Sequence, residues 1–537
     1  MPHRFEIFLI LLAVLAGAAL LAKRLNVAPA VMLLMTGVGL ALVPGLPRLE
    51  LEPEIVLLIV LPPLIYSASV AMSWREFRLH LRPITLLAFG CVIFTAAAVA
   101  VAMYYFAGLP WSLGFLLGAI VAPPDAVAPL AIARRLKLPR QVLVVLEGEG
   151  LVNDATALIM YRFAIAAIAT GMFSLRTAAG EFALIVAGEI VYGLFIGWTS
   201  LLLRNRARDP QVEITLSLIT PYLAYWLPEH LGGSGVLATV VCGLYISWNG
   251  PLLISAATRL QGIFFWDLVI YLTEGLLFLM TGAQLRMLLE KSRDFNLPRV
   301  LAATVIVAVT IVVARFVWVF ARLYLGWLAC IVLRALRIPI PLPPLPPWRH
   351  TFVIAFTGVR GAVSLAAALA LPLTVTSGAP FPDRDLMLFV IFGVILITMV
   401  GLGLTLPLVV KALGIAHIGH EEHLAEHEAE IIARRNLLAA TRASIDDMAK
   451  NRQLPEDIVD ILCARHLART SQVPASENDD NAHMTNDGAR LVRELIADER
   501  KFIHRLLREG QITDEARRRI ERDLDLEEAV LSNLGYR

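Results

Sequence analysis

Long apolar runs separated by charges, prolines or glycines fill the first three quarters of the chain. Residues 7–22 and 84–107 carry no charged side chain, and such runs approach or exceed the roughly 20 residues with which a helix spans a bilayer. The pattern predicts about thirteen spanning helices, near residues 5–22, 26–44, 53–73, 83–107, 111–133, 141–169, 180–203, 211–228, 232–249, 261–285, 299–325, 350–376 and 385–413. The predicted fold class is therefore an all-α polytopic membrane protein.

Composition supports this class. Of the 537 residues, 58% are hydrophobic and 17% charged, against roughly 25% charged in a soluble domain, which excludes an ordinary water-soluble enzyme. The bases lie in short loops between apolar segments rather than on one folded face, so we expect no nucleic-acid partner. The sequence also lacks a nucleotide motif such as GxxxxGK[ST], and we expect no cofactor.

The distribution of Lys and Arg predicts the orientation in the membrane. Loops after odd-numbered segments carry 16 of these bases, and loops after even-numbered segments carry 7. Because cytoplasmic loops are enriched in Lys and Arg, the odd loops and the C-terminal tail should be cytoplasmic. We expect a membrane domain over residues 1–414 and a cytoplasmic helical, regulatory tail over 415–537. Four histidines near its start are interpreted as a solvated helix surface, with metal binding or pH sensing as the alternative: His417, His420, His423 and His427.

The fifth apolar segment cannot be a continuous helix. Pro123 and Pro124 remove two amide donors and clash with the preceding turn. Irregular backbone at membrane depth is tolerated only where it is buried in protein or lines a wet cavity, and in transporters it coordinates cations. Asp125 follows directly, about midway along the segment. A carboxylate at that depth is costly and calls for a functional hypothesis.

The next segment adds two further acids. Asn153 and Asp154 are neighbours near mid-membrane, while Glu149 lies one helical turn before Asn153 on a face rotated away from Asp154. A carboxylate beside an amide oxygen and free carbonyls makes a hard-oxygen site for a small cation. The alternative is a protonated, structural Asp154.

A second interruption falls at residues 357–364, where two glycines flank Arg360. This arginine stays charged and needs a carboxylate; Glu149 is the predicted partner and Glu274 the second choice. Breaks in the fifth and twelfth segments are what two inverted six-helix repeats would give, so the site should lie where the breaks cross. Three other acids are interpreted as interfacial or pore-lining: Glu189, Glu213 and Asp267.

At these residues the chain resembles the monovalent cation:proton antiporters of the sodium/proton exchanger branch, the NhaP/NHE type. The resemblance covers residues 5–413 and is carried by four ordered motifs at residues 61–64, 124–128, 149–155 and 358–362. It implies thirteen transmembrane helices in two inverted repeats and a homodimer. It also implies an ion-binding Asp154 beside Asn153, an accessory Asp125, and an ion pair between Glu149 and Arg360.

The chain departs from the family pattern at three positions. Ser67 follows Leu-Pro-Pro-Leu where members commonly carry an acid, Gly150 stands where many have Ser, and Pro124 replaces the usual Thr. The Pro124 carbonyl remains a candidate ligand. Accessory candidates for the ion site are therefore Pro124, Ser67 and Thr156, and the departures bear on ion selectivity.

The expected function is a secondary antiporter of a bacterial-type inner membrane, exchanging Na⁺, or alternatively K⁺ or Li⁺, for H⁺ in pH and cation homeostasis. One carboxylate would hold either a proton or a cation, which makes the exchange electroneutral, and a core of segments four to six and eleven to thirteen would move against a dimerisation scaffold. The alternatives are a symporter of a small organic anion, with Arg360 as substrate ligand, and a membrane-embedded enzyme or sensor with a signalling tail.

Overall fold

The structure, a computed structural model, describes residues 2–44, 51–171, 174–291, 297–335, 346–374 and 380–451, with short pieces between residues 459 and 526. Helices dominate this part of the chain, and its only strand-type pairing is an isolated β-bridge between Thr374 and Pro380. The chain divides into two compact units, Met1–His420 and Glu421–Arg537. The predicted functional residues all belong to the first.

Each predicted spanning segment coincides with one helix or a short series of helices. Seven of the described helical segments are long and apolar enough to cross a membrane, and three shorter apolar helices add to them. The all-α polytopic class is thus confirmed, while the count of thirteen spans stays a prediction. The uninterrupted helices are α1 (Pro2–Leu25), α2 (Pro29–Ala41), α10 (Arg140–Thr170), α11 (Leu175–Ala207), α12 (Pro210–His230), α13 (Val236–Leu253), α14 (Ala256–Ala283), α16 (Leu297–Ala335) and α19 (Arg384–Leu413).

The third and fourth segments each contain a widened turn. In the third, a π-helical stretch, Val56–Val60, leads into α4 (Leu61–Ala71), whose first turn holds two prolines without amide hydrogens. The hydroxyl of Tyr222 donates to the exposed carbonyl of Ile59 at 3.2 Å. In the fourth, a π-helical stretch, Leu86–Cys91, lies between α6 (Leu81–Thr85) and α7 (Val92–Ala107), with α5 (Trp74–Leu79) before them. Side-chain donors from neighbouring helices thus stabilise irregular backbone.

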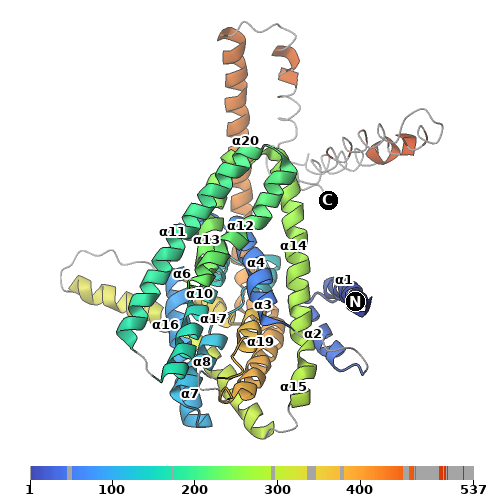
Figure 1. The fold of residues 1–537 in the computed structure, drawn as a ribbon. Helices are drawn as coiled ribbons and strands as arrows, with labels where there is room; N and C mark the ends of the chain where they lie inside the picture. The colour runs from blue at the N-terminus through green and yellow to red at the C-terminus, as the bar shows by residue number, and fades with distance from the viewer. Residues whose placement is uncertain are drawn as a thin grey trace. The chain divides into compact units, whose positions relative to one another are not determined.

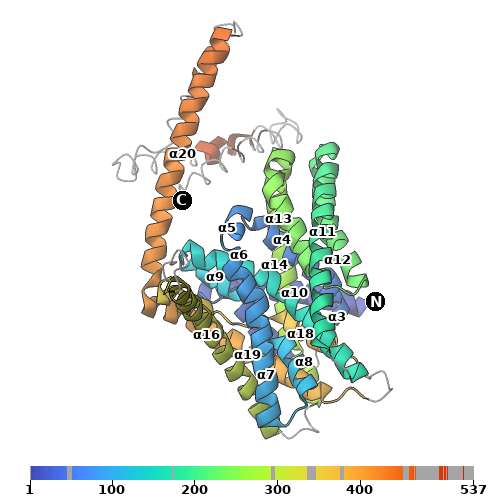
Figure 2. The ribbon, with the colours of Figure 1, turned by 90° about the vertical axis from the view of Figure 1, so that its left-hand side faces the viewer.

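The helices of the first unit form two packed groups. Helices α7, α10, α16 and α19 form one group with α8 (Trp111–Val121) and α18 (Ala362–Leu369), whereas α11, α12 and α13 pack together and against α4 (Figures 1 and 2). Helix α14 joins the second group, lying mainly against α2, where Gly37 and Gly282 meet. A Cβ at either glycine would collide with the backbone of the other helix. Small residues of this kind let membrane helices approach closely.

The two interrupted helices cross at their breaks. The first consists of α8 (Trp111–Val121) and α9 (Val127–Arg135), and the second of α17 (Trp348–Phe356) and α18 (Ala362–Leu369). The amide of Asp125 in the first break donates to the carbonyl of Val359 in the second at 2.7 Å. The predicted crossing of the breaks is therefore confirmed. The short helix α15 (Leu285–Lys291) follows α14, and the long helix α20 (Ile415–Asn451) follows α19.

Candidate functional site

Asp125 is fixed by both broken helices. Its carboxylate Oδ1 accepts the amide hydrogen of Val127 at 2.9 Å, which forms an Asx turn at the start of α9. Its own amide is held by Val359 across the crossing. The side chain is half-buried. The position of this carboxylate is therefore set by the prolines that end α8 and by the second break.

Arg360 is buried and surrounded by backbone oxygen. Its guanidinium donates to the carbonyls of Val121 at 2.7 Å and Ala122 at 3.1 Å, and also to that of Gly358. These carbonyls stand where α8 ends and the second helix is interrupted, so they lack intrahelical donors. The cation also faces the negative end of the α8 dipole. Carbonyls of the broken helices therefore stabilise Arg360.

The predicted ion pair between Glu149 and Arg360 is wrong. Glu149 pairs with Arg315 of α16 in a two-pronged contact, Nη1 to Oε1 at 2.5 Å and Nη2 to Oε2 at 2.8 Å. The two side chains are only 1% and 2% exposed. Arg315 also donates to the Ile354 carbonyl of α17. The sequence signal for Arg315 was its position inside a long apolar segment, where any arginine needs a partner.

The second-choice partner, Glu274, makes no ion pair within the described part of the chain. Arg360 has no carboxylate contact there either, because its donors are used by carbonyls. Five N–H donors in a fixed fork suit several carbonyl acceptors as well as one carboxylate. A buried arginine therefore does not require a carboxylate, because backbone carbonyls can accept its hydrogen bonds instead.

Asn153 ties α10 to the first break. Its amide Nδ2 donates to the carbonyl of Pro124 at 2.6 Å. A carbonyl has two lone pairs, so the Pro124 oxygen retains accepting capacity. Within the described residues, the Asn153 Oδ1 and Thr156 Oγ1 atoms are buried without a hydrogen-bond partner. Thr156 does not line the cavity described next.

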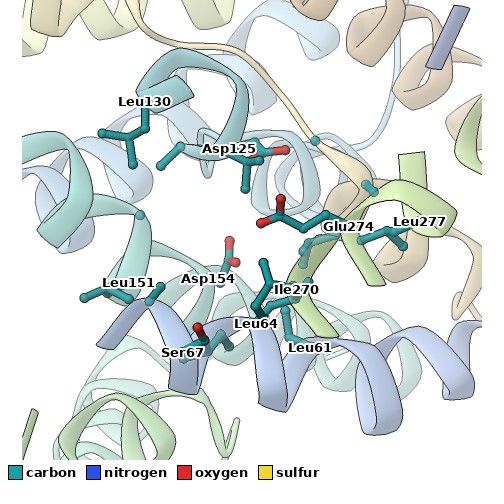
Figure 3. A pocket seen from close by; sticks show the side chains of 18 of the residues that line it. Leu61, Leu64, Ser67, Asp125, Leu130, Leu151, Asp154, Ile270, Glu274 and Leu277 are labelled. Atoms are coloured by element: carbon teal, nitrogen blue, oxygen red, sulfur yellow. The ribbon is translucent and has the colours of Figure 1, made fainter. Parts of the chain in front are cut away.

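Asp154 faces a cavity of about 450 Å³. The lining comes from α4, the break between α8 and α9, α10, α14 and α18, and the carboxylates of Asp125, Asp154 and Glu274 gather around it with Ser67 nearby (Figure 3). Asp154 is half-buried and has no hydrogen bond or ion pair to any described residue. Two predicted ion-site residues, Asp125 and Asp154, thus share one cavity, as does Ser67.

The space beside α10 is wide on one side of Asp154 and narrow on the other. Glu147, seven residues before Asp154 and therefore about 10 Å along the helix, lines the cavity and pairs with the 63% exposed Arg134 at 2.8 Å. In the other direction, Tyr161 lines a void of only about 10 Å³ beside Asp154. A void of this size holds one water at most. The wide approach to Asp154 therefore lies on the side of Glu147, and the space toward Tyr161 is narrow.

The other predicted residues lie in different surroundings. Asp267 lines the cavity, whereas Glu189 accepts the Ser234 amide at 2.6 Å at the start of α13, and Glu213 is buried. No group of three or more His, Cys, Asp or Glu that could hold a metal ion occurs among the described residues. The side chains of His423 and His427 lie outside the described part.

Comparison with known proteins identifies the family. A family model described as sodium/hydrogen exchanger, transmembrane, matches residues 10–412. An uncharacterised Na⁺/H⁺ exchanger of Mycobacterium tuberculosis is 34% identical, covering 97% of this chain and 95% of its own. The sodium, potassium, lithium and rubidium/H⁺ antiporter of Bacillus subtilis is 30% identical, over 76% of this chain and 61% of its own.

A solved structure shows the same fold. The sodium proton antiporter MjNhaP1 from Methanocaldococcus jannaschii matches with a TM-score of 0.61 and 18% identity, over 77% of this chain and 97% of that chain. The resemblance found in the four sequence motifs is thereby confirmed at the level of fold. The chain belongs to the sodium/hydrogen exchanger family of membrane transporters.

Proposed function

We propose that this protein exchanges Na⁺ for H⁺ at Asp154. The observation that carries the proposal is the position of this carboxylate, which has no protein partner among the described residues and stands between a cavity of about 450 Å³ and a narrow space of about 10 Å³. A half-buried carboxylate without a partner at membrane depth is stable only when a proton or a cation neutralises it. The geometry therefore favours one site for which H⁺ and Na⁺ compete.

Oxygen atoms around Asp154 support cation binding. Pro124, Asp125 and Ser67 line the same cavity as Asp154. The Pro124 carbonyl is held by the Asn153 amide. Na⁺ is a hard cation that prefers such carboxylate, carbonyl and amide oxygens. K⁺ and Li⁺ are the alternative substrates, and a competition series would rank them.

The wide space on one side of Asp154 and the narrow space on the other support an alternating mechanism. In the proposed cycle, the helix group that holds the two breaks moves against the group formed by α4, α11–α13 and α14, which closes the cavity on one side and opens a path on the other. An empty, charged Asp154 would be costly to carry through the closed state, whereas the protonated or cation-bound form is neutral. This difference couples the two ion flows.

The anion symporter is the less favoured alternative. Its substrate would need a free cationic side chain in the cavity, but Arg360 is not among the lining residues and donates to three carbonyls. The single basic lining residue is Arg134, which is paired with Glu147. Acidic side chains therefore dominate the cavity, and they favour cations.

The test of the proposed function is exchange by the purified full-length protein in proteoliposomes. An imposed Na⁺ gradient should drive proton flux, read with a pH-sensitive dye, whereas choline should not. Proton flux without dependence on any alkali cation would overturn the proposal. Stimulation by an organic anion would favour the symporter.

We further propose a homodimer in a bacterial-type inner membrane with the tail, residues 415–537, in the cytoplasm. The excess of Lys and Arg in the odd-numbered loops supports this orientation. It places the open end of the cavity, near Arg134 and Glu147, on the cytoplasmic side.

We expect the exchange to be electroneutral. Asn153 ligates a cation but carries no proton, so Asp154 supplies one negative charge for either one Na⁺ or one H⁺. Net movement of a charge would couple the rate to voltage by about 2.3 kcal/mol per 100 mV. Initial Na⁺-driven rates in proteoliposomes clamped with K⁺ and valinomycin should therefore not change with the sign of the potential. A marked change would identify Asp125 as a second proton carrier.

Gly361→Ala is expected to reduce exchange severely, by about 10-fold or more, since misplacement of a reacting group by 1 Å can cost 10²-fold. A Cβ at this position would overlap the carboxylate of Asp125, which must shift away from the crossing. Gly180→Ala on α11 is the matched control, because its Cβ would meet no atom within 4 Å. Equal exchange rates for the two variants would contradict the role given to the crossing.

A further inference from the structure

Glu274 lies on the wall of the cavity opposite the broken helices. Together with Asp267, Ile270 and Leu277 it forms one face of α14 that lines the cavity, and Figure 3 shows its carboxylate directed into the space that also holds Asp125 and Asp154. Within the described residues, Glu274 has no hydrogen bond and no ion pair. A carboxylate placed in this way at membrane depth calls for a cationic partner.

The charges around the cavity do not balance. Its acidic lining residues are Asp125, Glu147, Asp154, Asp267 and Glu274, and its basic lining residue is Arg134. Arg134 is already paired with Glu147, which leaves four acids. A cleft with charges of one sign and low-dielectric walls concentrates counterions, typically 10- to 1,000-fold.

A buried hydroxyl independently points to a ligand. Ser364, in the first turn of α18, is 4% exposed and lines both the cavity and the small void beside Asp154. Its hydroxyl has no hydrogen-bond partner among the described residues. A buried polar group is normally satisfied, so this oxygen is available to a bound species. The ligand oxygens of Asp125, Asp154 and Ser364 all belong to the broken-helix group.

Glu274 belongs to the other group. Helix α14 packs mainly against α2, with smaller contacts to α1, α4, α12 and α18. Asp154 is on α10, whose largest contact is with α8 of the broken-helix group and which also touches α4 and α13. Alternating access requires the two groups to change their relative position. In the proposed cycle, Glu274 would therefore face Asp154 while the cavity is open and would stay behind when the broken-helix group moves.

We propose that Glu274 attracts cations at one face of the membrane only. In the state with the cavity open, Glu274 draws a monovalent cation into the cavity and passes the cation to Asp154. In the state open to the opposite face, Glu274 does not contact the cation. This inference rests on the proposed exchange at Asp154. It makes the apparent affinity for the cation dependent on Glu274 on one side of the membrane only.

The test compares Glu274→Gln with the wild type in membrane vesicles of both orientations. At alkaline pH, Na⁺ added to everted vesicles reaches the cytoplasmic face, and Na⁺ added to right-side-out vesicles reaches the other. The variant should raise the apparent KM for Na⁺ about 10-fold on the cavity side, with the maximal rate changed less than about 2-fold, and leave the KM on the opposite side unchanged. Glu274→Asp should retain most of the affinity because it keeps the charge.

Glu290→Gln is the matched control, since Glu290 lies outside the cavity on α15 and forms a half-exposed contact with Arg286. A KM that rises equally on both faces would overturn the proposal, because Glu274 would then accompany the ion. A KM that is unchanged on both faces would overturn it as well. Na⁺ binding to the detergent-solubilised full-length protein, read as the rise of the melting temperature with NaCl against choline chloride, gives a second measurement. If the wild type binds Na⁺ but does not exchange it, the proposed antiport is refuted and the role of Glu274 in binding is not. If Glu274→Gln reaches half of the rise in melting temperature at the same Na⁺ concentration as the wild type, the role of Glu274 is refuted.

Discussion

Asp154→Asn should abolish Na⁺/H⁺ exchange while leaving a folded, membrane-inserted protein. The substitution keeps the shape of the side chain and removes the only group proposed to hold a proton and a cation in turn. Because Asp154 makes no hydrogen bond or ion pair among the described residues, its loss breaks no such contact, and we expect no decrease in melting temperature. The measurement is Na⁺-driven proton flux in proteoliposomes, together with the melting temperature in detergent.

Asp209→Asn serves as the control for this variant. The Asp209 side chain accepts the Val212 amide at 3.0 Å and caps α12, and Asn caps a helix as well as Asp does. This second change of Asp to Asn should therefore leave exchange intact. Retention of more than a trace of exchange by a well-folded Asp154→Asn protein would contradict the assignment.

Local chemistry explains why the core of the site could be predicted from the sequence. Two adjacent prolines end a helix wherever they occur, so the break before Asp125 was visible without a structure. Helical spacing likewise placed Asn153 beside Asp154 and turned Glu149 away from it. The structure adds that the first break meets the second through the 2.7 Å hydrogen bond from Asp125 to Val359.

Partners from distant segments were less predictable. The sequence offers two arginines at membrane depth, and helical periodicity gives the face of Glu149 but not the helix that this face meets. Glycines beside Arg360 mark an interrupted helix in the sequence, whereas Arg315 lies in an apolar segment without any motif. The actual partner is decided by how α16 packs against α10 and α17.

Glu274 shows the same limit. From the sequence it was a candidate partner for an arginine, since nothing local distinguishes a carboxylate that neutralises a buried cation from one that lines a cavity. Its role depends on the packing of α14 on α2, which turns the face with Asp267 and Glu274 toward the broken helices. Neither the cavity nor its charge can be read from residue spacing alone.

Arg315→Ala should destabilise the membrane domain by about 3 to 5 kcal/mol, the cost of leaving one member of a buried ion pair without its partner. Glu149 is 1% exposed, so water cannot replace the two guanidinium contacts, and the Ile354 carbonyl loses its donors as well. Unfolding of the detergent-solubilised protein in SDS mixtures measures the loss. Arg286→Ala should cost about 0 to 1 kcal/mol, because its i,i+4 contact with Glu290 is partly exposed to solvent.

The double substitution Glu149→Gln/Arg315→Gln identifies the partner. Two neutral amides bury no charge and can hydrogen-bond to each other, so the double variant should be more stable than the sum of the single losses predicts. Glu149→Gln/Arg360→Gln should instead be additive, since Arg360 donates to carbonyls whose loss of donors is independent of Glu149. If the coupling appeared with Arg360 and not with Arg315, the pairing of Glu149 with Arg315 of α16 would be wrong. The carbonyls at the end of α8 would then no longer account for the buried charge of Arg360.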